Sequence, residues 1–132
     1  MKICLFSSSK DCSLEFKDKV SDLIDTLSNH LIICGKSDTG LMNFIYQKVY
    51  KKNMTKGECD ICIILPGGIG TLYEMLEMIY YEKPIFIYNI EGFYTSFIDF
   101  IEELKTLKFI DRELNIHVCN NLNELTECIN TL

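Results

Sequence analysis

The residues from Pro66 to Thr71, here called the glycine loop, join an apolar run to an amphipathic segment, and three of these six residues are glycines. We interpret the run as a buried strand and the segment as a helix. Gly67, Gly68 and Gly70 would allow positive φ and a close approach of backbone N–H groups to a ligand. The positive end of the helix favours an anion, and Thr71 can add a hydroxyl donor or cap the helix. The loop therefore indicates a phosphate site, although a plain tight turn can have a similar composition.

Two carboxylates, Glu74 and Glu77, follow the glycine loop on the predicted helix. Their spacing of three residues lets both lie on one face, and Glu74 is near enough to the loop to reach a sugar joined to a bound phosphate. A carboxylate there could stabilise positive charge on a ribose or activate water to attack it. It could instead complement the helix N-terminus, an effect below about 1 kcal/mol at a surface. The spacing leaves both interpretations open.

The elements that must position these residues alternate between strand and helix. Short apolar runs predict five strands, at residues 2–6, 31–34, 60–65, 84–88 and 116–119. Helical spacing of apolar residues predicts helices over 12–29, 40–52, the segment after Thr71, 93–107 and 122–132. In the helix after Thr71, the residues expected to face the core are Leu72, Met75, Leu76 and Ile79.

This alternation predicts an α/β fold with a doubly wound, Rossmann-like parallel sheet and helices on both faces. A length of 132 residues fits one such domain. Ligands of these sheets lie at the carboxyl ends of the strands, where the segments Ser7–Lys10, Gly35–Gly40 and Pro66–Thr71 should meet. In these segments Ser8, Ser9 and Gly35 are further candidates for binding phosphate or sugar.

Four motifs, in order, resemble those of the LOG family, whose members have long been labelled lysine decarboxylases. Residues 65–74, LPGGIGTLYE, resemble its PGGxGTxxE signature. Phe6–Ser9 is similar to its FxGSS motif, residues 35–42 to its GGGxxGLM motif, and residues 83–94 to its KPxxxxNxxGYY segment. The resemblance covers roughly residues 2–110, and four ordered motifs are specific at the level of a family.

The resemblance implies a dimeric enzyme that hydrolyses nucleoside 5′-monophosphates, such as AMP, to free base and ribose 5-phosphate. It places the 5′-phosphate on the glycine loop and implies that Glu74 stabilises an oxocarbenium-like ribose and orients water. Glu77 is a second catalytic candidate, and Ser8 and Ser9 would fix sugar or phosphate. The site is completed across a two-fold dimer near the helix after Thr71. No cofactor is implied.

The chain departs from the family pattern at several positions. Ser7, Lys36 and Asn43 stand where the family has glycine. Between the second motif and the signature the family has a further strand and helix, whereas this chain has only residues 43–59. The loss of one such unit should leave five strands, in the order 2-1-3-4-5.

The lost helix normally bears a catalytic arginine, and this loss leaves two functions open. The one arginine of the chain, Arg112, lies far downstream of the glycine loop. Lys51 or Lys52 could replace the charge but not the planar geometry of a guanidinium, and a solvated lysine face is the simpler interpretation. The intact Glu74 favours a hydrolase, which we prefer; the missing arginine favours a protein that binds or senses a nucleotide or an ADP-ribose derivative. Decarboxylation is not expected, because no lysine lies in an apolar site suited to a pyridoxal cofactor.

Composition argues against several other classes. A net charge of −6 disfavours a broad grip on nucleic acid or an anionic membrane. No apolar run approaches the roughly 18–20 residues of a membrane span, and the start is too short for a signal peptide, so a cytoplasmic location is expected. The seven cysteines form no disulfide framework. Cys59 and Cys62 should point to opposite faces of a strand, so no metal site is expected.

Overall fold

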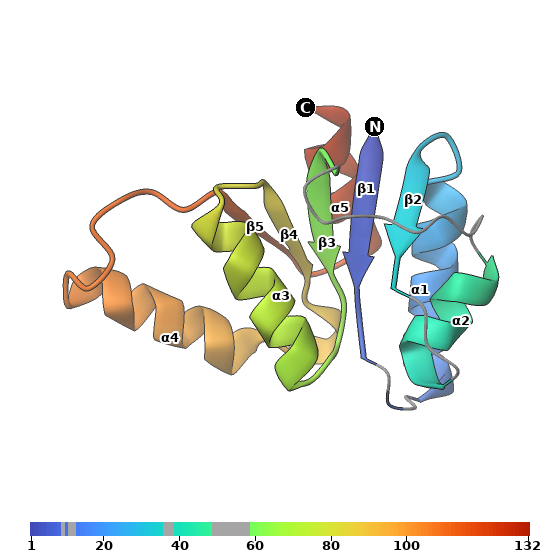
Figure 1. Cartoon of the computed structure of the whole chain (residues 1–132), viewed down its shortest axis with the longest axis horizontal. Coiled ribbons are helices and arrows are strands. Elements are labelled where there is room, and N and C mark those ends of the chain that lie inside the picture. Colours follow the sequence, from blue (N-terminus) through green and yellow to red (C-terminus); the bar gives the residue numbers. More distant parts are fainter. Residues whose placement is uncertain (9, 11–12, 36–38, 49–58) are drawn as a thin grey trace.

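The computed structural model describes residues 1–8, 10, 13–35, 39–48 and 59–132, and within them five parallel strands form one sheet (Figure 1). The strands are β1 (Lys2–Phe6), β2 (Leu31–Cys34), β3 (Ile61–Ile64), β4 (Ile85–Tyr88) and β5 (Ile116–Cys119). They lie in the order β2-β1-β3-β4-β5. Because the inner strands are apolar along their whole length, both faces of the sheet can be covered. The predicted Rossmann-like α/β class and strand order are confirmed.

Helices cover both faces of this sheet, as predicted. They are α1 (Leu14–Thr26), α2 (Gly40–Lys48), α3 (Ile69–Tyr80), α4 (Thr95–Thr106) and α5 (Leu122–Asn130), with a short 3-10 helix, η2 (Ile90–Gly92). One hydrophobic cluster joins α1, α2 and α5 to the sheet, and a second joins α3 and α4 to its other face (Figure 1). Among the described residues no helix is both long and apolar enough to cross a bilayer. Residues 49–52, which end the predicted second helix, lie outside the described residues.

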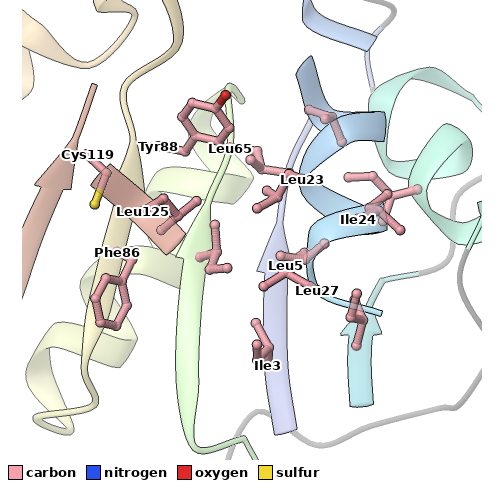
Figure 2. Packing of buried hydrophobic residues seen from close by; sticks show 14 of the residues in the cluster. Ile3, Leu5, Leu23, Ile24, Leu27, Leu65, Phe86, Tyr88, Cys119 and Leu125 are labelled. Carbon is pink, nitrogen blue, oxygen red and sulfur yellow. The ribbon is translucent and has the colours of Figure 1, made fainter. Parts of the chain in front are cut away.

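The first cluster fixes the central strands of the sheet, including β3, which leads into the glycine loop. Leu23 of α1 and Leu27, the C-cap residue of that helix, pack over Leu5 of β1, and Leu125 of α5 lies near Phe86 of β4 (Figure 2). Each such side chain contributes about 1.5–3 kcal/mol when it is fully buried. The second cluster is smaller, and α3 contributes the buried Met75 and Met78 to it.

The outer side of α3 carries apolar side chains, and one of them was expected in the core. Leu76 is 45% exposed, so the prediction that it faces the core is wrong. Each residue of a helix turns by about 100°, which puts Leu76 on the outward side with Tyr73 and Tyr80 when Met75 and Met78 point inward. This geometry leaves an apolar stripe on the surface next to the glycine loop.

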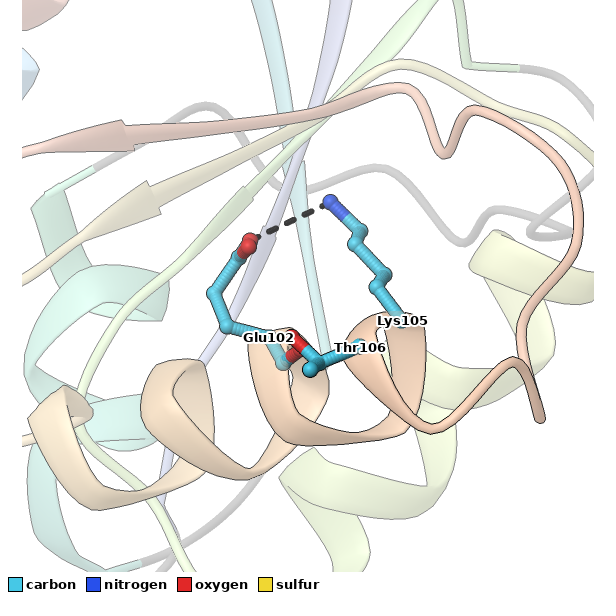
Figure 3. A network of polar contacts seen from close by, with 3 residues as sticks. All are labelled: Glu102, Lys105 and Thr106. Carbon is cyan, nitrogen blue, oxygen red and sulfur yellow. Dashed lines mark hydrogen bonds and ion pairs between the residues drawn. The ribbon is translucent and has the colours of Figure 1, made fainter.

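Helix α4 is the least buried helix of the described chain and contains no fully buried residue. Its polar side is ordered by local contacts, since Lys105 Nζ lies 3.2 Å from Glu102 Oε1 (Figure 3). The Thr106 hydroxyl donates to the Glu102 carbonyl at 3.0 Å. This helix begins near the glycine loop, where its N-cap residue Tyr94 contacts Leu65, and its far end lies at one end of the molecule (Figure 1).

Candidate functional site

The loops after β1, β2 and β3 meet at the carboxyl edge of the sheet, and the Ser8 backbone joins them. Its N–H donates to the Pro66 carbonyl at 3.1 Å, and its carbonyl accepts from the Met42 N–H at 2.8 Å. The Ser8 hydroxyl accepts from the Lys10 N–H at 2.9 Å. The expected meeting of the first and third loops is confirmed, and the first turn of α2, which follows the second loop, joins them; residues 36–38 and Ser9 lie outside the described residues.

A cavity of about 370 Å³, here called the first cavity, opens at this junction. Its lining includes five of the predicted site residues: Ser8, Gly68, Gly70, Thr71 and Glu74. It also includes four residues that were not predicted as ligands: Ser7, Lys10, Met42 and Ile69. Met42 belongs to the GLM motif, which was the available signal for it.

The glycine loop presents the start of α3 to the first cavity. Gly68 is the N-cap residue, and no side chain caps the helix there. The N–H groups of the first helical turn therefore remain available for an anion. Gly67, Gly68 and Gly70 do not have positive φ, which among the described glycines occurs at Gly40 and Gly92, so that part of the prediction is wrong. A Cβ at Gly68 or Gly70 would meet nothing within 4 Å. The absence of side chains at these two residues therefore leaves the backbone exposed at the edge of the cavity.

Gly67 is required for a different reason. A Cβ at this position would lie 2.1 Å from Thr71 Oγ1, because the buried Thr71 side chain packs directly on the Gly67 backbone. Gly67 lines a neighbouring cavity and not the first one. Because Gly67 has no side chain, Thr71, in the first turn of α3, can pack against the backbone of the loop.

Ser7 brings an unsatisfied polar atom to the first cavity. Its side chain is 2% exposed, and Oγ has no hydrogen-bond partner within the described chain. A buried hydroxyl left in this way costs about 1–3 kcal/mol. A ligand oxygen in the first cavity would supply the missing partner. In the sequence, Ser7 stands where the family has glycine and begins the segment Ser7–Lys10 expected at this edge, but its residue type alone does not predict a ligand.

The two predicted catalytic carboxylates differ in position. Glu74 is half-buried and lines the first cavity. Glu77 is half-buried one turn farther along α3 and is not part of the lining of that cavity. Gly35 is exposed and lies outside the lining as well, but a Cβ there would lie 3.0 Å from Met42 Sδ, so Gly35 gives Met42 its space. The predicted roles of Glu77 and Gly35 remain predictions.

Of the cationic candidates, Arg112 belongs to the described part of the chain and lies away from the first cavity. Arg112 precedes β5 at the amino edge of the sheet, where its Nη1 pairs with Glu82 Oε1. Lys51 and Lys52 lie outside the described residues. Lys10 is the basic residue that the structure brings to the cavity.

Two polar residues that were not among the predicted site residues fix the chain at the start of the glycine loop. The buried Tyr94 hydroxyl donates to the Leu65 carbonyl at 2.6 Å. Asn89 Oδ1 accepts from the Tyr94 N–H at 2.7 Å. Burial raises the pKa of Tyr94, and a hydrogen bond with the Gly67 backbone partly opposes this rise. The segment that resembles KPxxxxNxxGYY contains both residues and was the signal for them.

The cysteine pair also differs from its prediction. Cys59 and Cys62 are buried with their Sγ atoms 3.5 Å apart, so they do not point to opposite faces. Cys59 precedes β3, and the alternation of a strand does not apply to it. Hydrogen bonds with the Cys4 and Cys62 thiols lower the pKa of Cys59 from its usual value. In the described ranges, no group of three or more histidine, cysteine or acidic side chains is arranged to hold a metal ion.

Solved structures share this architecture. The Moco carrier protein of Chlamydomonas matches with a TM-score of 0.73 over 98% of this chain and 96% of that protein, at 11% identity. A second structure of this carrier matches with a TM-score of 0.71 at 13% identity. At these identities the match shows the fold alone.

Sequence relatives match a shorter region. A cytokinin riboside 5′-monophosphate phosphoribohydrolase of Arabidopsis thaliana is 41% identical over 66 residues, which are 46% of this chain and 30% of that protein. A cytokinin riboside 5′-monophosphate phosphoribohydrolase of Oryza sativa subsp. japonica is 42% identical over 57 residues, 39% of this chain and 24% of that protein. The chain thus spans less than a third of these relatives. A family model described as "Possible lysine decarboxylase" matches residues 22–129, and the chain therefore belongs to this family, the LOG family.

Proposed function

We propose that the chain binds a nucleoside 5′-monophosphate in the first cavity and hydrolyses its N-glycosidic bond, releasing free base and ribose 5-phosphate. One observation carries the proposal: the open first turn of α3, the unpartnered Ser7 hydroxyl and the Glu74 carboxylate line the same cavity. The first two suit phosphate or sugar oxygens, and the carboxylate suits a developing positive charge.

The proposed reaction uses each of these groups. The 5′-phosphate accepts hydrogen bonds from the N–H groups of Gly68–Thr71, with the Lys10 ammonium beside it. The ribose then extends toward Glu74, which lies one turn into α3. As the bond from C1′ to the base breaks, Glu74 stabilises the positive charge on the ribose and takes a proton from the attacking water. The water oxygen joins C1′ as a hydroxyl, and the proton that Glu74 took up passes to the departing base, which leaves neutral and returns Glu74 to its carboxylate form.

A second candidate function is binding without turnover, of a nucleotide or an ADP-ribose derivative. The position of Arg112 favours it, since this side chain pairs with Glu82 at the opposite edge of the sheet. The family description names a decarboxylation, which uses a pyridoxal cofactor. The hydroxyls, first-turn N–H groups and carboxylate of the first cavity are better suited to binding a phosphorylated sugar than to binding that cofactor with an amino acid.

Chromatography of AMP, CMP, GMP and ADP-ribose after incubation with the protein distinguishes the two candidates. The hydrolase releases free base from at least one monophosphate, and Glu74→Gln lowers this rate by about 10²–10⁴-fold. AMP affinity should stay within a few-fold. Glu103→Gln is the matched control, because Glu103 is an exposed glutamate of α4 that does not line the first cavity. Binding of AMP with no release of base would contradict the hydrolase and support the binding protein.

We also propose that the chain forms a homodimer through the outer side of α3. Ile69, Tyr73 and Tyr80 are 82%, 66% and 75% exposed and, with Leu76, form one stripe along the helix. Ile69 also lines the first cavity, so a second copy seated on the stripe would border the site. Tyr73→Glu should shift the mass measured by light scattering from two chains to one. A wild-type mass of one chain would contradict the proposal.

A further inference from the structure

A second cavity, of about 420 Å³, adjoins the first. Ser8, Lys10 and Gly68 line both cavities, so the two spaces lie on either side of the proposed phosphate position. Each has the size of sites that take small organic molecules, roughly 300–1,000 Å³. A mononucleotide that extends from the glycine loop to Glu74 leaves the second cavity unused.

Two aromatic rings form the apolar wall of the second cavity. Phe16 of α1 and Phe93, just before α4, meet edge to face with ring centroids 6.3 Å apart and planes at 82°. Phe93 also contacts Tyr94, at 4.9 Å between ring centroids, and Tyr94 is anchored to Leu65. Phe93 is nevertheless 46% exposed. A fixed, accessible ring at a cavity is a surface on which a planar group can stack.

Within the second cavity, the side lined by Glu91 disfavours phosphate. Glu91, which lines it, has a φ of 53°, a left-handed conformation uncommon for a residue with a side chain. A hydrogen bond with Glu15 and the charge of that carboxylate raise the pKa of Glu91. Two neighbouring carboxyl groups repel a phosphate, whereas a carboxylate accepts hydrogen bonds from ribose hydroxyls. The cationic Lys10 lies instead at the boundary between the two cavities.

We propose that the site takes a pyrophosphate-linked nucleotide that spans both cavities, with a nucleoside end stacked on Phe93 and its ribose at Glu91. The phosphates lie between the cavities, at Gly68 and Lys10, and the second sugar lies in the first cavity toward Glu74. This inference rests on the proposed function for the position of the phosphate. It adds that the preferred ligand is larger than a mononucleotide.

Calorimetric titration with ADP-ribose and with AMP tests the inference, and both titrations use the Glu74→Gln background so that neither ligand is consumed. ADP-ribose should bind about ten-fold more tightly than AMP, the scale of one base stacked on an aromatic side chain. Phe93→Ala should remove this difference and leave AMP affinity within about two-fold. Phe100→Ala is the matched control, because Phe100 is an exposed aromatic on α4 that lines neither cavity. Glu91→Gln, which leaves the ring wall intact, should also weaken ADP-ribose but not AMP.

The outcomes separate this inference from the proposed function. Equal affinities for the two ligands, or an equal loss of both in Phe93→Ala, would overturn the inference while the phosphate site stands. Binding of neither ligand would overturn the phosphate site itself. A selective loss of ADP-ribose in both Phe93→Ala and Glu91→Gln, with Phe100→Ala unchanged, is the result expected.

Discussion

The two edges of the sheet differ in whether their polar groups have hydrogen-bond or ion-pair partners within the described chain. At the amino edge the polar groups pair with one another: the Lys2 N–H donates to Asp60 at 2.8 Å, Lys83 Nζ donates to the Cys59 carbonyl at 3.1 Å, and Arg112 pairs with Glu82. At the carboxyl edge the Ser7 hydroxyl has no partner in the described chain, and no side chain caps α3. The carboxyl edge therefore keeps polar capacity that a ligand can use, at some cost in stability.

The largest effect on stability is expected at Gly67. In Gly67→Ala the added Cβ would overlap Thr71 Oγ1, so the free energy of unfolding should fall by about 1–3 kcal/mol, the range for an overpacked site. Urea denaturation measures this change. Gly68→Ala, with open space around the new Cβ, should stay within about 0.5 kcal/mol. Equal losses in the two variants would contradict the difference drawn between these glycines.

Tyr94→Phe should lower the free energy of unfolding by about 1 kcal/mol, because it removes the buried hydrogen bond to the Leu65 carbonyl. The effect should depend on pH. Since folding raises the pKa of Tyr94 above its usual value near 10, the hydroxyl contributes stability below that pH and loses it as the pH rises further. Wild type and Tyr94→Phe should therefore converge in urea denaturation above pH 10. A constant difference between them would contradict this account.

Ser7→Ala sharpens the comparison because its two effects have opposite signs. Removal of the unpartnered hydroxyl should raise the free energy of unfolding by about 1 kcal/mol, while AMP affinity falls. Thermal unfolding and calorimetry on the same samples measure both. Loss of stability together with unchanged affinity would mean that Ser7 Oγ has a structural partner and no ligand role.

The smallest effect is expected at the amino edge. Arg112→Gln breaks an exposed ion pair with Glu82, so the free energy of unfolding should change by less than about 1 kcal/mol. AMP binding should be unchanged, because Arg112 lies at the other edge of the sheet. A large loss of binding would show that this arginine reaches the site, and would reverse the assignment of the two edges.

The sequence predicts the sheet well because each strand is a short apolar run, as in Ile61–Ile64, and such runs need no long-range information. The glycine loop was placed correctly for the same reason. The structural reason for Gly67 differs from the predicted one. Glycine is needed there because the Thr71 side chain packs against its backbone, and not because its φ is positive. The direction of the Cys59 side chain could not be predicted from strand alternation, because β3 begins at Ile61 and Cys59 lies before it. The second cavity depends on Phe16 and Phe93 meeting from distant segments, which no local pattern contains.

The central claim is that the glycine loop at the carboxyl edge binds the phosphate of a nucleotide. Gly68→Val tests it most directly, because the position tolerates a Cβ in the free protein but lies at the proposed phosphate site. Calorimetry with AMP, in the Glu74→Gln background, compares the protein with and without this change. The account predicts an unchanged thermal unfolding temperature and loss of measurable AMP binding. Unchanged AMP affinity in Gly68→Val would contradict it.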